Sequence, residues 1–166
     1  MRKLTILGLV FGLMMMAVPA AGADSAPRPF HGSAAGSLTF IPGTDCQNYG
    51  GLNVRTDGAA VGTSSHLGRT VLTTSHCSPE GPDFAGEATL VAANGDEVYI
   101  EYSGVNSPPD PETMIILSST TFVIVGGSGR FDGAQGDGTL TAAVLYEGFE
   151  DFEWPARWVW EGTIGY

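Results

Sequence analysis

The chain has 166 residues, of which 43% are hydrophobic, so its length and composition suit one domain with one core. Its net charge of −11 at pH 7 gives an electrostatic field of the wrong sign for nucleic acid or for an anionic membrane surface. We therefore expect neither as a partner.

Residues 1–23 have the three regions of a secretory signal peptide. Arg2 and Lys3 precede an apolar stretch at 4–18, and small residues follow as far as an Ala-Gly-Ala cleavage pattern. Because the stretch is shorter than the ~20 residues that span a bilayer, we predict cleavage after Ala23, export to the periplasm or the extracellular space, and no membrane anchor in the mature protein. Cleavage leaves five arginines, no lysine and 18 acidic residues, a net charge of −13, which excludes a Schiff-base lysine and a P-loop.

The mature chain contains short runs rich in Val, Ile, Thr, Tyr and Phe, separated by clusters of Gly, Pro, Asn and Asp. This pattern is typical of an antiparallel all-β domain, and no stretch has apolar residues at helical spacing for three turns. We predict a flexible N-terminal segment at 24–35 and a single β-domain at 36–166. The predicted strands cover residues 36–41, 49–55, 59–66, 69–77, 84–93, 96–103, 114–125, 137–147 and 156–165.

Local signals refine the connections between these strands. The pair Asn94-Gly95 predicts a type I′ hairpin turn, because both central positions of that turn have positive φ angles. Polar residues at 118–121 interrupt a long apolar run and predict a bend or bulge in that strand. The prolines in residues 106–112 cannot pair in the centre of a sheet, so this segment is expected at a rim.

Eight or nine strands without helices form either a closed barrel or two packed sheets. Closure removes exposed sheet edges, and in-strand glycines such as Gly62, Gly86 and Gly138 suit sharply coiled strands. We predict an antiparallel closed β-barrel of eight strands, with nine as the alternative number and a sandwich as the competing architecture.

The chain has two cysteines, Cys46 and Cys77, and export would place them in an oxidising compartment. We predict a disulfide between them. His76 precedes Cys77 and His66 lies ten residues earlier, but three histidines and two cysteines at irregular spacing match no zinc pattern. We expect neither a metal nor a cofactor.

The densest glycine cluster lies between two strong strands and contains Gly126, Gly127, Gly129 and Gly133. A phosphate-binding loop is excluded because no helix pattern follows and the required lysine is absent. A nucleophile elbow is excluded because Arg130 stands where that motif requires a glycine after Ser128. We interpret the cluster as a structural connection that places Phe131 in the core, and a side chain at Gly127 should destabilise the barrel if this residue has a positive φ angle.

This glycine segment also carries a resemblance. Gly-Gly-Ser-Gly-Arg-Phe-Asp-Gly-Ala-Gln-Gly at 126–136 resembles the run that joins two strands in the allene oxide cyclase and dirigent barrels. With Ser-His-Leu-Gly-Arg at 65–69 and Ala-Ala-Asn-Gly-Asp at 92–96, the chain is similar to small secreted bacterial members of the allene oxide cyclase barrel-like group over about residues 58–140. The resemblance implies an eight-stranded barrel with an apolar cavity, and a homo-oligomer, as in the trimeric plant relatives. No catalytic position of the plant enzymes can be placed on this chain.

An eight-stranded barrel has an interior just wide enough to be filled by side chains or to hold one small ligand. Small strand residues such as Ala88 and Ala142 would leave part of this interior unfilled. We predict a cavity that binds a small hydrophobic ligand and is walled in part by aromatic side chains. The predicted ligand-binding residues are His66, Tyr99, Glu101, Trp158 and Trp160.

Two functions are compatible with these features. The first is an exported protein that binds a small hydrophobic ligand or has a structural role. The second is an isomerase or cyclase that orients a reactive apolar substrate in the barrel. No catalytic constellation is complete in the sequence, so it leaves open whether the protein is an enzyme. A buried acidic or histidine side chain with a strongly shifted pKa in an apolar pocket would favour the second function.

Overall fold

The computed structural model describes residues 26–42, 54–77, 82–148 and 152–166. The predicted signal peptide and Cys46 lie outside these residues. The strands are β1 (Arg28–Pro42), β2 (Val54–Ser64), β3 (Gly68–Cys77), β4 (Asp83–Ala92), β5 (Glu97–Asn106), β6 (Ile115–Gly127), β7 (Gly136–Leu145) and β8 (Glu153–Ile164), and a short 3-10 helix, η2, spans Gly129–Phe131. In this part of the chain, no helix has the length and apolar character needed to cross a membrane.

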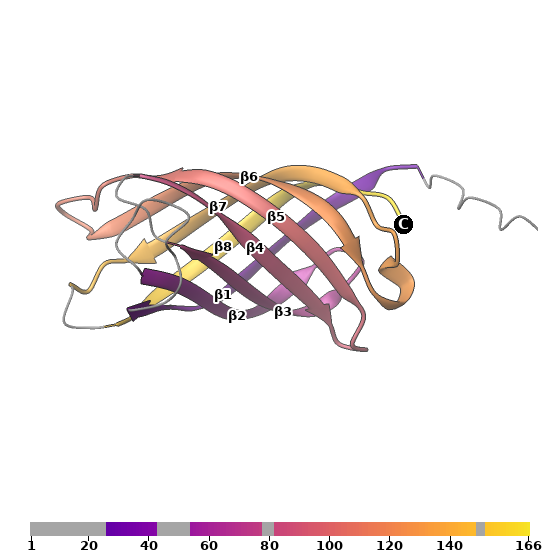
Figure 1. Ribbon diagram of the computed structural model, residues 1–166, viewed down its shortest axis with the longest axis horizontal. Helices are drawn as coiled ribbons and strands as arrows, with labels where there is room; N and C mark the ends of the chain where they lie inside the picture. The colour runs from indigo at the N-terminus through magenta and orange to yellow at the C-terminus, as the bar shows by residue number, and fades with distance from the viewer. Residues whose placement is uncertain (1–25, 43–53, 78–81, 149–151) are drawn as a thin grey trace, which may run out of the picture.

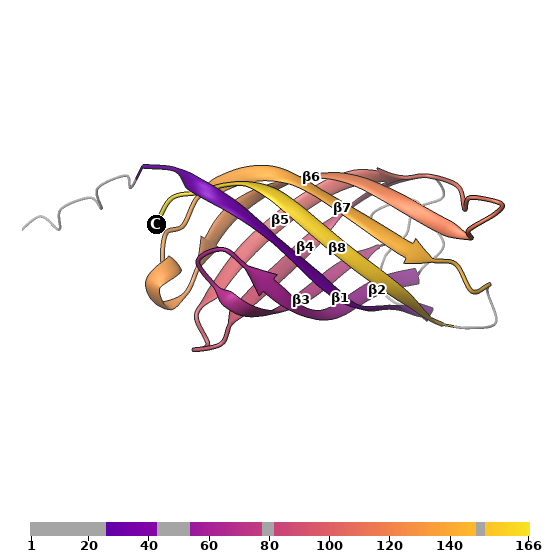
Figure 2. The ribbon, with the colours of Figure 1, turned by 180° about the vertical axis from the view of Figure 1, so that it is seen from behind.

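The strands form a closed antiparallel barrel (Figures 1 and 2). Each strand pairs with the next one along the chain, and β8 pairs with β1 over residues 28–39 of β1. This last pairing leaves no sheet edge open and therefore decides between the barrel and the sandwich. The predicted eight-stranded closed barrel is confirmed.

The alternation of side chains along each strand explains the core. Successive residues of a strand point to opposite faces of the sheet, and in β8 every second residue from Trp154 to Trp160 is buried while its neighbours are exposed. The inward set therefore fills the barrel interior. Outward positions carry the polar and charged side chains, together with scattered apolar ones such as Val61 and Val125.

The strand registers fix the tilt of the barrel. The paired residues can be followed from strand to strand around the barrel, starting at Phe40 of β1. After one full turn they return to β1 at Phe30, so the register is staggered by ten residues. Such a stagger makes the strands cross the barrel axis at a steep angle, about 35–45° in closed barrels, which is visible as the diagonal ribbons of Figure 1. Neighbouring inward residues therefore lie at different depths in the interior.

The two ends of the barrel differ. The end that carries η2, the C-terminus and the β2–β3 and β4–β5 turns is called the closed end here, and the opposite end is called the open end (Figure 1). Phe30, Phe131 and Ile164 are each fully buried at the closed end. The Phe131 ring stacks edge-on against Tyr166 with 4.7 Å between centroids. These large side chains fill the closed end.

The N-terminal boundary of the barrel differs from the prediction. β1 begins at Arg28, so residues 28–35, predicted as part of a flexible segment, belong to the barrel. Their small side chains hid the strand pattern, and the structure shows why they are small. Gly32 pairs with Trp160, and a Cβ atom on Gly32 would overlap the Trp160 ring. Most of the strand predicted at 49–55 lies outside the described residues, and β2 begins at Val54.

Two local predictions also need correction. The β4–β5 hairpin is present, but Asn94 does not have a positive φ angle and only Gly95 does, at +88°. Because the Gly95 N–H donates to the carbonyl of Ala92 at 2.9 Å, the turn is a type I turn followed by a left-handed glycine, which also suits strand twist. In β6 the irregularity falls at Val125, where the pairing with β5 shifts, and not at 118–121.

The glycine cluster connects two strands, and the predicted burial of Phe131 is confirmed. It joins β6 to β7 through η2 and directs Phe131 into the closed end, where its side chain has no exposed area. Gly126, Gly129 and Gly133 have positive φ angles. Gly127 does not, so the condition of a positive φ angle is not met there. Gly127 is restricted instead by space, because a Cβ atom there would lie 2.6 Å from the carbonyl oxygen of Phe131.

Candidate ligand-binding site

A cavity of about 100 Å³ lies inside the barrel at the open end. Its lining comes from all eight strands, so the barrel interior itself forms the walls. One wall is apolar and comprises Leu38, Phe40, Leu140, Val144, Trp154 and Trp158. The facing wall carries polar groups from Thr56, Thr74, His76, Tyr102, Ser118 and Thr120. The site can therefore hold an apolar body and hydrogen-bond a polar substituent.

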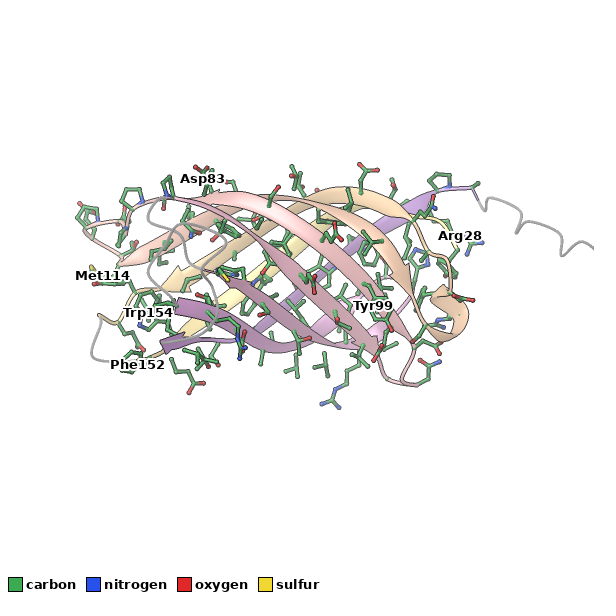
Figure 3. The ribbon with its side chains drawn as sticks, in the orientation of Figure 1. Arg28, Asp83, Tyr99, Met114, Phe152 and Trp154 are labelled. Carbon is green, nitrogen blue, oxygen red and sulfur yellow. The ribbon has the colours of Figure 1, made fainter. Side chains whose placement is uncertain are left out.

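Aromatic contacts hold the apolar wall in place. The Trp154 ring lies 4.3 Å from the Phe40 ring and 4.9 Å from the Tyr146 ring, measured between centroids. Its indole N–H donates to the carbonyl of Gly148 at 3.1 Å. Trp154 lies at the end opposite Arg28 (Figure 3), and Trp158 follows it into the barrel because the two are an even number of residues apart on β8.

A glycine on β4 creates the central contact of the polar wall. Gly86 pairs with His76 of β3 on one side and with Tyr102 of β5 on the other. A Cβ atom on Gly86 would lie 2.6 Å from the His76 Cβ and 2.9 Å from the Tyr102 hydroxyl. Because Gly86 has no side chain, the other two meet across it, and the Tyr102 hydroxyl forms a hydrogen bond of 3.0 Å with Nδ1 of His76.

Burial sets the ionisation of this pair. It lowers the pKa of His76 to about 4, although the nearby carboxylate of Asp57 opposes the shift. Burial also raises the pKa of Tyr102 well above its usual range. The Thr74 hydroxyl, which is close to Tyr102 but not in ordinary hydrogen-bond geometry with it, opposes that rise, whereas the charges of Asp57 and Glu87 add to it. Both side chains are therefore neutral at pH 7.

Two hydroxyls of the polar wall are buried without a hydrogen-bond partner. Thr74 is 7% exposed and Thr120 is 5% exposed, and neither Oγ1 atom has a hydrogen-bond partner among the described residues. Ser118, in contrast, donates to the side-chain oxygen of Asn106 at 2.6 Å. An unpaired buried hydroxyl costs about 1–3 kcal/mol, so the two threonine hydroxyls are available to a bound molecule.

The structure brings only part of the predicted site together. Trp158 lines the cavity. Trp160 also points inward and is buried, but it does not line the cavity. Tyr99 and Glu101 lie on the outer face, where the Tyr99 hydroxyl donates to Glu97. Their assignment to the cavity was wrong, because the inward set of β5 is the alternate one that includes Tyr102.

His66 lies at the closed end, far along the barrel from the cavity. It occupies the β2–β3 turn with a φ angle of +68°, and its Nε2 is 2.9 Å from the carbonyl oxygen of Pro29. The Arg130 guanidinium donates to the His66 carbonyl at 2.5 Å. These contacts indicate that His66 supports the turn, so its predicted place in the cavity was wrong.

Sequence reasoning missed His76, Tyr102 and the two threonines as a group. One signal was present: Leu72, Thr74 and His76 share one face of β3 at a period of two, and Leu72 marks that face as the inward one. The meeting of His76 with Tyr102 has no such signal, because it depends on the register of three strands.

The predicted disulfide stays a prediction. Cys77 ends β3 next to His76 at the open end, whereas Cys46 lies outside the described residues. A bridge would fasten segment 43–53 to this end of the barrel.

No protein-family model, curated protein or solved structure matches this chain. The fold and the site define its class: an eight-stranded antiparallel barrel, closed by large side chains at one end, with a small cavity at the other that has one apolar and one polar wall.

Proposed function

We propose that the protein is an exported barrel that binds a small hydrophobic molecule in the cavity at its open end. The observation that carries this proposal is the pair of buried hydroxyls of Thr74 and Thr120, which have no partner among the described residues and belong to a polar wall that faces an apolar one. A bound molecule with one hydrogen-bonding substituent would satisfy them and offset the cost of their burial. The aromatic wall around Trp154 would contact its apolar part.

The size of the cavity limits the ligand. At about 100 Å³ it is smaller than the pockets of roughly 300–1,000 Å³ that hold drug-sized molecules. It is closer to the engineered cavity of about 150 Å³ that binds benzene in another protein. The expected ligand is therefore one ring or a short chain with a single polar substituent.

Export is part of the proposal. Cleavage after Ala23 would leave every described strand intact, because β1 begins at Arg28. N-terminal sequencing of the secreted protein should begin at Asp24, and a secreted form that retains residues 4–18 would contradict the signal-peptide assignment.

The resemblance to the allene oxide cyclase and dirigent barrels supports ligand binding and adds the expectation of a homo-oligomer. Light scattering of the purified mature protein tests that expectation, which a monomeric mass would contradict.

An isomerase or cyclase is the second candidate, and His76 favours it. A buried histidine with a strongly lowered pKa in an apolar pocket is a common feature of proton-transfer sites. A pKa of about 4 makes His76 a weak base at neutral pH, however, so it suits hydrogen bonding better than proton abstraction. Conversion of the bound molecule by the wild type, lost in His76→Gln with binding retained, would establish this second function.

The main test is native mass spectrometry of the purified mature protein, followed by identification of the small molecules that it releases. Ala142→Leu fills the cavity from β7, whereas Ala143→Leu adds the same side chain on the outer face one residue further on. We expect the released molecule to disappear from Ala142→Leu and to remain with Ala143→Leu. Equal amounts in both variants would place the binding elsewhere, and no bound molecule in any preparation would favour a structural role.

A further inference from the structure

In the part of the chain that the structure describes, no charged side chain lines the cavity. None of the residues that line it is Asp, Glu, Lys or Arg, and its two titratable groups, His76 and Tyr102, are neutral at pH 7 because of their burial. A ligand that carries a charge into this cavity would therefore find no opposite charge to pair with. Burying an unpaired ion is far more costly than burying a neutral polar group that can be hydrogen-bonded.

The cations of the mature chain lie elsewhere. It has five arginines and no lysine. Arg55 is on β2 at the open end, but its guanidinium is 2.9 Å from the carboxylate of Asp57. The guanidinium groups of Arg28 and Arg130 lie over the rings of Tyr166 and Phe131 at the closed end. The remaining two, Arg69 and Arg157, line a shallow groove on the outer face.

Carboxylates surround the open end instead. Asp83 and Glu153 begin β4 and β8, Asp110 and Glu112 lie in the β5–β6 connection, and Glu147 follows β7. The Asp110 carboxylate accepts hydrogen bonds from the backbone and side chain of Thr113, which lowers its pKa and keeps it ionised. An anion that approaches the cavity from this end meets charges of its own sign.

Resting on the proposed binding function, we infer that the cavity selects a neutral molecule with a hydrogen-bonding substituent and excludes the carboxylate of the same shape. The hydroxyls of Thr74 and Thr120 can each donate to and accept from a neutral amide, alcohol or carbonyl. A carboxylate would lose its hydration and gain only hydroxyl donors, against the field of Asp57 and of the surrounding acidic side chains.

Benzamide and benzoate test this inference, because they have the same shape and differ in charge. Isothermal titration calorimetry of the mature protein at pH 7.5 should show benzamide binding and a benzoate affinity at least about tenfold weaker. The indole NMR signals of Trp154 and Trp158 should shift with benzamide. Benzoate binding as tight as that of benzamide would overturn the inference and leave the proposed function standing. Binding of neither molecule would contradict the proposed function and the inference with it.

A variant with a new cation gives the converse test. Asn106 lies at the end of β5 and lines the cavity, so Asn106→Lys places an ammonium group there, and Asn106→Gln is the neutral control. We expect the ratio of benzoate to benzamide affinity to rise at least about tenfold in Asn106→Lys and to stay unchanged in Asn106→Gln. An unchanged ratio in a folded Asn106→Lys would show that charge does not exclude benzoate.

Discussion

The closed and open ends of the barrel are built from the same eight strands and the same alternation of inward and outward residues, yet only the closed end is filled. There, Phe30, Phe131 and Ile164 have no exposed area. At the open end the inward set includes Gly86, Thr74 and Ala142. Because these residues are small, part of the interior stays unfilled and forms the cavity. The comparison teaches that the volume of the inward side chains, and not the arrangement of the strands, decides whether the interior of a barrel of this size is filled or contains a cavity.

The two ends also treat buried hydroxyls differently. Thr70, fully buried near the closed end, donates its hydroxyl to the carbonyl of Gly68 at 3.0 Å. Thr120, which is also buried but lies at the open end, has no hydrogen-bond partner for its hydroxyl among the described residues. Thr120 therefore bears the cost of an unpaired buried hydroxyl, as does the buried indole N–H of Trp160, which lies outside the cavity lining. Such a cost is typical of functional sites.

The largest expected effect comes from emptying the closed end. Phe131→Ala should lower the free energy of unfolding by about 3–5 kcal/mol, because it removes a fully buried ring and leaves a void. Urea unfolding followed by tryptophan fluorescence measures the change. Phe152→Ala is the matched control, because its ring is 55% exposed, and it should change stability by less than about 0.5 kcal/mol. Equal effects of the two variants would contradict the division into a filled and an unfilled end.

The next effect is a pH dependence located at the open end. The pKa of His76 is about 4 in the folded protein and about 6.5 when exposed, so the unfolded state binds more protons between these values. Stability should therefore fall as the pH is lowered from about 6.5 to 4, by a contribution on the order of 3 kcal/mol. Urea unfolding at several pH values should show this slope reduced in His76→Gln. His31→Gln, a change at an exposed histidine of β1, should keep it. A wild-type slope in His76→Gln would show that His76 does not titrate as a buried group.

A smaller effect is expected from crowding the closed end. Gly127→Val should lower the free energy of unfolding by roughly 1–3 kcal/mol, because its Cβ atom would lie 2.6 Å from the Phe131 carbonyl oxygen. Ala35→Val adds the same side chain at an outward position of β1 and should be almost neutral. Benzamide binding by the folded fraction should be unchanged in both. Lost binding with unchanged stability in Gly127→Val would reassign the glycine segment to function.

The smallest effect has opposite signs at the two ends. Thr120→Val should raise the free energy of unfolding by about 1 kcal/mol, because it removes an unpaired buried hydroxyl, and it should weaken benzamide binding. Thr70→Val should lower the free energy of unfolding by about 1 kcal/mol, because it breaks a buried hydrogen bond. Denaturant unfolding and calorimetry measure both quantities. A loss of stability in Thr120→Val would mean that its hydroxyl is satisfied in the free protein.

The sequence by itself determined the all-β class, most strand positions and the burial of Phe131 within the glycine cluster. These features depend on local rules: the period-two alternation of β8, the Asn94-Gly95 turn, and glycines at left-handed positions such as Gly129 and Gly133. The rules weaken where a strand carries small residues, which is why the start of β1 was predicted too late.

Only the tertiary structure decided which polar residues share the cavity. His76 and Tyr102 are 26 residues apart in sequence and meet because the registers of β3, β4 and β5 align them on either side of Gly86. A shift of one residue in either pairing would turn one of them outward. Alternation along one strand shows which residues face inward, but the depth of each residue in the barrel depends on the ten-residue stagger of the closed sheet, which is a property of all eight pairings together.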